Sequence, residues 1–207
     1  DFGLITNVGR AHLEGFGSLD GVKKAKGELY DYIRMHEGSL FINADLDYLQ
    51  EMATGIHTQY TYGTSNAQII GKDISDTPFL KVAVLTHLLE TSIQTQLIGS
   101  YNLPNVLAAV AVGHHFGVAI EVIKAALEAY TPSNSRSQLV KTALNEVILD
   151  AYNANPTSMD LAIKNLAQVS HTKKVLMLGS MKELGADSII EHQKIIDTAH
   201  QFAFEAI

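Results

Sequence analysis

Three times along this chain, a short apolar run leads into a loop and then into a helical pattern. The apolar runs are residues 2–8, Glu146–Leu149 and Lys174–Leu178. The helices that follow are predicted from Ser18 to about His36, from Pro156 to about Val169, and from Asp187 onward. Strands that alternate with helices are typical of a parallel sheet, and such folds place ligand groups in the loops after the strands. We therefore expect an α/β fold.

The middle of the chain has a different sequence pattern. Four short β-type runs suggest a small antiparallel sheet: Thr58–Tyr62, Ala67–Ile74, Leu80–Thr86 and Ser92–Ile98. Before them, Ser39–Asn43 predicts a strand, and Asp45 is expected to cap a helix to about Thr54. After them, helices are predicted over Leu103–Phe116 and Ala119–Tyr130. The breakers in Thr131–Ser135 indicate a linker, which gives two domains, 1–132 and 133–207.

Charge and composition exclude several classes of protein. The net charge is −7, so the chain has no electrostatic footprint for nucleic acid or an anionic membrane. It has no cysteine, which excludes disulfides and thiolate metal sites. No apolar run reaches the roughly 18 residues of a membrane span, and no secretory leader is visible. We expect a cytoplasmic monomer. Asp1 opens on a strand and Ile207 ends a helical pattern, so we also expect a longer parent protein.

The phosphate-binding motif G-x-x-x-x-G-K-[S/T] is absent. The only Gly-Lys pair, Gly71-Lys72, is followed by Asp73, and Asn66 stands where the motif needs glycine. Because the chain is acidic, we expect any polyanionic ligand to be held by local features, such as helix N-termini, a metal or single basic residues.

Lys26 lies within a predicted apolar stripe of the helix from Ser18, formed by Leu19, Val22, Leu29 and Ile33. The simpler interpretation is a lysine whose charged end reaches water. The alternative is an amine with a lowered pKa that adds CO2 to become a carbamate, a group that can bind metal.

Several polar residues in loops or at helix ends have two interpretations each. His12 is a metal ligand or a surface residue. Asn102 caps the helix that has Pro104 in its first turn, or reads a purine edge together with Asn105. Local chemistry favours the cap.

The remaining candidates lie beyond the linker. Asp150, after a strand, faces a ligand hydroxyl or belongs to a capped turn with Asn155 as the N-cap. Arg136 is a phosphate ligand or a surface residue.

Taken together and in order, these motifs resemble the Mur ligase family, most closely its members that use D-Ala-D-Ala. The resemblance rests on Thr6–Asn7, Ala11–Ser18, Lys24–Glu28, Tyr152–Met159 and Leu178–Gly185 with His192. It implies part of a central ATPase domain, with a parallel sheet plus a small antiparallel sheet, followed by an incomplete Rossmann-like C-terminal domain. It also implies ATP and Mg2+ as cofactors. The reaction would join D-Ala-D-Ala to UDP-N-acetylmuramoyl-tripeptide through an acyl phosphate.

The resemblance assigns roles to individual residues. His12 would be a magnesium ligand, and Lys26, as a carbamate, would bridge to magnesium; both would be catalytic. The expected ATP contacts are Asn7, Asn102, Asn105, Arg136 and Asp150. The expected substrate contacts are Tyr152, Asn153, Asn155, Met181 and Glu183.

The sequence departs from the family pattern at two positions, where Ser180 and Leu149 replace acidic residues. Neither departure removes a residue assigned above. Two alternatives remain: a non-catalytic module that binds nucleotide or dipeptide, and another Mur ligase or a folylpolyglutamate synthetase relative.

Overall fold

The computed structural model describes residues 1–86, 89–133, 135–171 and 173–207. They form two compact units. Unit 1 contains Asp1–Val8 and Lys26–Thr131, and unit 2 contains Gly9–Ala25 and Pro132–Ile207. Asn134 of the predicted linker lies outside the described residues. The early segment Gly9–Ala25 therefore groups with the C-terminal part of the chain.

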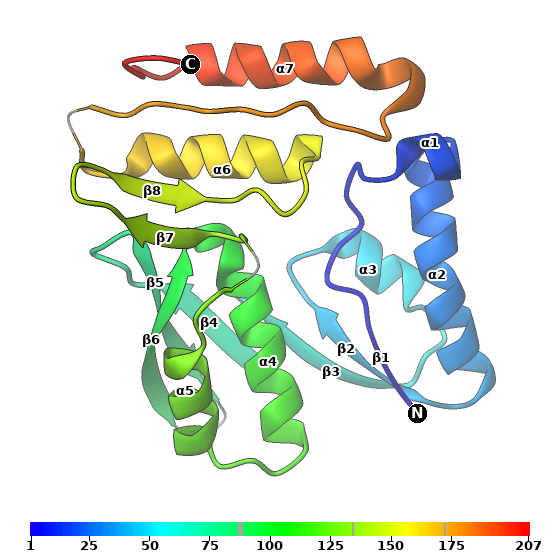
Figure 1. Ribbon diagram of the computed structural model, residues 1–207. Coiled ribbons are helices and arrows are strands. Elements are labelled where there is room, and N and C mark those ends of the chain that lie inside the picture. Colours follow the sequence, from blue (N-terminus) through cyan, green and yellow to red (C-terminus); the bar gives the residue numbers. More distant parts are fainter. Residues whose placement is uncertain (87–88, 134, 172) are drawn as a thin grey trace. The chain divides into compact units, whose positions relative to one another are not determined.

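Unit 1 is built on a six-stranded sheet (Figure 1). Its strands, in spatial order, are β1 (Phe2–Leu4), β2 (Ser39–Asn43), β3 (Thr58–Gly63), β4 (Ile69–Asp73), β5 (Phe79–Leu85) and β6 (Glu90–Ile98). Pairing is parallel from β1 to β4 and antiparallel from β4 to β6. Three of the four runs predicted to form a small antiparallel sheet, β4, β5 and β6, pair in this way. The fourth, β3, pairs in parallel with both β2 and β4 and joins them into one continuous sheet.

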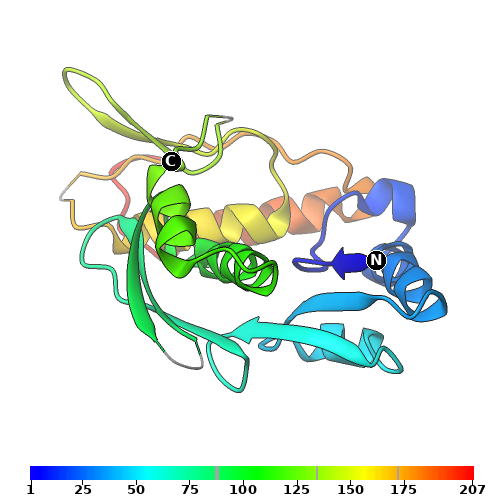
Figure 2. The same cartoon turned by 90° about the horizontal axis from the view of Figure 1, so that it is seen from below.

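Helices cover both faces of this sheet. They are α2 (Leu19–Met35, whose first residues belong to unit 2), α3 (Asp47–Met52), α4 (Leu103–His115) and α5 (Ile120–Ala129). Figure 2 shows α3 and α4 on opposite sides of the strands. Strand β2 contributes to both cores: Leu40 and Ile42 pack with residues of α2 and α3, and Phe41 packs with residues of α4 and α5. Burial on both faces is typical of a central parallel strand.

Of the two predicted helix caps, Ser18 and Asp45, one is confirmed and one is wrong. The Ser18 hydroxyl accepts a hydrogen bond from the Gly21 N–H at 3.1 Å, which confirms it as the cap of α2. The prediction for Asp45 was wrong. Its carboxylate accepts from the N–H of Thr64 at 2.8 Å, and α3 begins two residues later, at Asp47. The carboxylate thus fastens the turn after β3 instead of the helix.

Unit 2 contains the one-turn helix α1 (Leu13–Phe16), the hairpin β7 (Gln138–Lys141) and β8 (Glu146–Leu149), and the helices α6 (Pro156–Gln168) and α7 (Ser188–His200). The predicted strand Lys174–Leu178 forms a single parallel bridge, between Val175 and Ala206. This partner differs from the prediction, because the sequence indicated helix from Asp187 onward, whereas α7 ends at His200 and the segment after it bridges Val175. No helix among the residues that the structure describes is both long and apolar enough to cross a membrane.

Two glycines of α2 differ in the room around them. A Cβ at Gly21 would lie 1.9 Å from the carbonyl oxygen of Phe16, whereas a Cβ at Gly27 would meet only the Met52 methyl at 3.5 Å. We expect Gly21→Ala to lower the free energy of unfolding by about 1–3 kcal/mol, because a backbone atom must move. The control Gly27→Ala should be neutral or stabilising by up to about 1 kcal/mol. Urea denaturation measures both, and equal midpoints would contradict the expectation.

Candidate functional site

Lys26 lies in the first half of α2, and its amine donates a hydrogen bond to the Asn7 carbonyl at 2.7 Å. Asn7 follows β1, so the contact joins two predicted site residues that are 19 positions apart. Both residues are exposed, as a ligand contact requires. The structure therefore brings the candidate amine to the loop at the carboxyl end of β1.

The apolar stripe around Lys26 is narrower than predicted. Val22 and Ile33 are buried, but Leu19 and Leu29 are 39% and 37% exposed. Lys26 thus sits at the edge of the buried face. Partial burial there lowers the pKa of the Lys26 amine from its ordinary value. The shift increases the fraction of neutral amine at a given pH, and the neutral amine is the form that reacts with CO2.

Asn102 and Asn105 lie together at the start of α4, but Asn102 does not cap the helix through its side chain. The buried Asn102 amide donates to the Ile98 carbonyl at 2.9 Å, and its oxygen accepts from the Asn105 side chain at 3.2 Å. Asn105 is exposed. The contact holds the exposed amide of Asn105 at the surface, where a purine could meet it.

His12 precedes α1 in unit 2, and its Nδ1 contacts the carboxylate of Glu183. The backbone supports the contact, because the N–H of Glu14 donates to the Glu183 carbonyl at 3.0 Å. Both side chains are more than half exposed. The structure therefore joins a predicted metal ligand to a residue predicted to bind substrate.

Arg136 and Tyr152 also meet, with the guanidinium carbon 3.8 Å from the centre of the tyrosine ring. Such stacking uses the face of the guanidinium, so the N–H donors at its edge can still reach a phosphate. Asp150 directly follows β8, and its carboxylate accepts from the N–H of Ser137 at 3.4 Å. Ser137 directly follows Arg136, so the residues predicted to hold phosphate and ribose lie close to one another in unit 2.

The remaining predicted substrate residues have structural partners. Asn155 is the N-cap of α6, with the Ser158 N–H donating to its side chain at 2.9 Å. Asn153 accepts from the N–H of Ala154. Met181 is buried, and its N–H donates to Nε2 of His192 at 3.0 Å. Of these three side chains, that of Met181 faces the interior of unit 2.

Sequence reasoning missed a buried ion pair in unit 2. Glu191 is 3% exposed and accepts from Arg10 at 2.7 Å and from Lys194 at 2.8 Å. Glu191 lies on the buried stripe of α7 with Ile195 and Ala199. That spacing is a signal of the kind used for Lys26, but nothing local identifies Arg10 as the partner.

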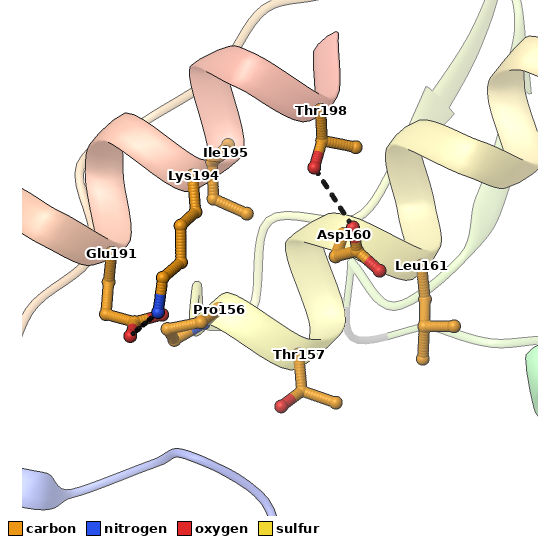
Figure 3. Close-up of a pocket in the computed structure, with 8 residues that line it drawn as sticks. All are labelled: Pro156, Thr157, Asp160, Leu161, Glu191, Lys194, Ile195 and Thr198. Atoms are coloured by element: carbon orange, nitrogen blue, oxygen red, sulfur yellow. Dashed lines mark hydrogen bonds and ion pairs between the residues drawn. The ribbon is translucent and has the colours of Figure 1, made fainter. Parts of the chain in front are cut away.

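A cavity of about 330 Å3 lies between α6 and α7 (Figure 3). Its lining residues are Pro156, Thr157, Asp160, Leu161, Glu191, Lys194, Ile195 and Thr198. Two pairs of polar side chains meet there: Thr198 donates to Asp160 at 3.2 Å, and Lys194 donates to Glu191 at 2.8 Å. None of the predicted ligand-binding residues lines this cavity.

No cluster of three or more histidine, aspartate or glutamate side chains suited to a metal occurs within the described ranges. The predicted metal ligands still fit magnesium in part. A carbamate on Lys26 would provide carboxylate oxygens, which are the ligands that Mg2+ prefers.

Comparison with known proteins adds to these observations. The family model of the Mur ligase middle domain matches residues 1–113, and that of the Mur ligase glutamate ligase domain matches residues 135–206. The chain belongs to the Mur ligase family.

Individual Mur ligases resemble the chain along nearly its whole length. It is 34% identical to the UDP-N-acetylmuramoyl-tripeptide–D-alanyl-D-alanine ligase of Escherichia coli, over 95% of this chain and 44% of that protein. A crystal structure of MurF from Acinetobacter baumannii has a TM-score of 0.89 and 29% identity, covering 99% of this chain and 46% of that one. MurF of Thermotoga maritima in complex with ADP, at 19% identity and a TM-score of 0.82, shares the fold, covering all of this chain and 52% of that one. The chain thus spans about half the length of the relatives it matches.

The capping role of Asn155 in this Mur ligase chain can be tested separately from substrate binding. We expect Asn155→Ala to destabilise unit 2 by about 1 kcal/mol, because the N–H of Ser158 loses its acceptor. Asn155→Ser should retain most of the stability, since a serine hydroxyl also caps. Thermal unfolding measures both variants, and an equal loss in the two would argue against the cap.

Proposed function

We propose that this chain is part of an ATP-dependent ligase that joins D-Ala-D-Ala to UDP-N-acetylmuramoyl-tripeptide in peptidoglycan precursor synthesis. The similarity to the E. coli ligase carries the proposal, because it runs through both units and is not confined to a general nucleotide-binding element. Within the proposed enzyme, residues 1–132 belong to the ATP-binding domain and residues 133–207 to the C-terminal ligase domain.

The proposed reaction has two steps. The terminal carboxylate of the tripeptide takes the γ-phosphoryl group of ATP, which gives an acyl phosphate and ADP. The free amine of D-Ala-D-Ala then attacks the acyl carbon, phosphate leaves, the amine loses a proton, and an amide forms. Positioning and charge neutralisation provide most of the catalysis in phosphoryl transfer. The ADP bound to the T. maritima relative supports the nucleotide assignment.

Lys26 and His12 are the proposed magnesium-binding residues. The neutral Lys26 amine adds CO2 and releases a proton, leaving a carbamate that retains one N–H for the Asn7 carbonyl. Magnesium, when bound, would neutralise charge that develops on the transferred phosphoryl group. The lowered pKa of Lys26 favours the carbamate, because it leaves more of the amine neutral.

The other polar residues are assigned to the nucleotide and the dipeptide. Asn105, held by Asn102, is proposed to contact adenine, and Asn7 to contribute to the ATP site. Asp150 is proposed to hold the ribose and Arg136 the phosphates. For the dipeptide we propose Tyr152, Asn153 and Asn155 with the loop that carries Met181 and Glu183.

The absence of a phosphate-binding motif within these 207 residues favours a second candidate, a module that binds nucleotide or dipeptide without turnover. Phosphate release by the full-length gene product distinguishes the two. We expect release only when ATP, UDP-N-acetylmuramoyl-tripeptide and D-Ala-D-Ala are all present. Release that is unchanged when glutamate replaces the dipeptide would instead favour another branch of the family, and no release with all three substrates would favour the binding module.

The carbamate on Lys26 can be detected directly. With 13C-labelled CO2, we expect a carbamate NMR signal that is absent in Lys26→Arg and retained in the control Lys24→Arg, an exposed lysine of the same helix. Because the pKa of Lys26 is lowered, the signal should persist to lower pH than that of an ordinary lysine and fade as the amine becomes protonated. A signal that survives in Lys26→Arg would show that the carbamate is elsewhere.

A further inference from the structure

Two segments of unit 2 that are distant in sequence meet at several points. The His12 imidazole contacts the Glu183 carboxylate, 171 positions away, and the Glu14 N–H donates to the Glu183 carbonyl at 3.0 Å. Arg10, two residues before His12, binds Glu191 at 2.7 Å. The loop that carries His12 is thus held by residues at and just before the start of α7.

The contact with Glu183 determines which nitrogen of His12 carries the proton. An ionised carboxylate only accepts hydrogen bonds, so Nδ1 of His12 must be the donor. In a neutral imidazole, the lone pair is then on Nε2. Histidines that bind metals commonly donate their second ring N–H to a carboxylate, which fixes the orientation of the ring and makes the ligand nitrogen more basic.

We propose that Glu183 is a positioning residue for His12: it holds the Nδ1–H so that Nε2 is presented to a divalent cation. The proposal rests on the metal role of His12 in the proposed function. It gives Glu183 a task that is separate from the dipeptide contact expected from the family resemblance.

An exposed ion pair alone contributes little to stability, so the backbone must also hold His12 and Glu183 in place. His12 and Glu183 both have left-handed backbones, with φ of 57° and 61°. Such conformations are uncommon outside glycine and persist where the surrounding structure holds them. On the Glu183 side, His192 provides that support: its Nε2 accepts from the Met181 N–H at 3.0 Å, and its Nδ1 donates to the Ser188 carbonyl at 2.7 Å.

The Arg10–Glu191 pair provides a second, stronger attachment. The Glu191 side chain is only 4% exposed, and Lys194 also donates to it at 2.8 Å. A buried carboxylate without a cation would be costly, so Arg10 is kept at α7. The contacts of Arg10 with Glu191 and of Glu14 with Glu183 lie on either side of His12 in the sequence. Together they hold His12 close to Glu183. In this arrangement, the orientation of a metal ligand depends on a loop of the C-terminal part of the chain.

The experiment compares Glu183→Ala, Glu183→Gln and His12→Ala in the full-length gene product, with Glu146→Ala as a control carboxylate in the β7–β8 hairpin. Nitrogen-15 NMR of labelled histidine reports the tautomer of His12. Electron paramagnetic resonance of free Mn2+ reports cation affinity. Both measurements are made without dipeptide, so a role of Glu183 in dipeptide binding would not affect them.

We expect Glu183→Ala to lose the Nδ1–H tautomer of His12 and to bind Mn2+ about 10-fold more weakly or worse, as for other carboxylates behind metal-binding histidines. Glu183→Gln should restore the tautomer, because its amide oxygen can accept the same hydrogen bond. Glu146→Ala should match the wild type.

The outcomes separate this inference from the proposed function. If His12→Ala weakens Mn2+ binding but Glu183→Ala leaves both the tautomer and the affinity unchanged, the positioning role is wrong and the metal role stands. If His12→Ala binds Mn2+ like the wild type, the metal role of His12 fails and the positioning role fails with it.

Discussion

The burial of β2 on both faces is the constraint on which unit 1 depends. Leu40 and Ile42 point into one core and Phe41 into the other, and each is at most 2% exposed. A polar side chain at any of these positions would lose its hydration without a partner. With both faces covered, β2 pairs in parallel with β1 and β3, and each parallel pair needs a connection that crosses over the sheet.

The crossover from β1 to β2 creates the contact between Lys26 and Asn7. A connection between adjacent parallel strands must return from the carboxyl end of the first to the amino end of the second. Helix α2 makes that return, and its part within unit 1 begins at Lys26. Lys26 reaches the Asn7 carbonyl for this reason, although 19 positions separate them. The candidate amine is thus placed by the topology of the sheet and not by any feature of the loop itself.

Local sequence patterns predicted elements well and their partners poorly. Ser39–Asn43 and the cap at Ser18 follow from hydrophobic pattern and helix-start chemistry, which act within a few residues. The pairing of β3 with β2 could not be predicted in this way, because alternation identifies a strand without naming its neighbour. The Asn102 cap failed for a similar reason: a short 3-10 turn, Ser100–Asn102, precedes α4, and the amide turns back to the Ile98 carbonyl. Among the site residues, the motifs pointed to Lys26 and His12. They also pointed to Asn7 and Glu183, but in other roles, and did not predict that these two residues contact the lysine and the histidine.

Lys26 and Glu191 show two solutions to one problem, a charge on the apolar side of a helix. The lysine has a long, flexible side chain at the edge of its apolar stripe, so its amine reaches the surface and the Asn7 carbonyl. Partial burial lowers the pKa of this amine. The glutamate is shorter and lies within its stripe, so it cannot reach water and needs cations brought to it. Lys194 lies within reach on the same helix, but the second cation, Arg10, comes from 181 positions away. The distant partner fastens the loop that carries His12.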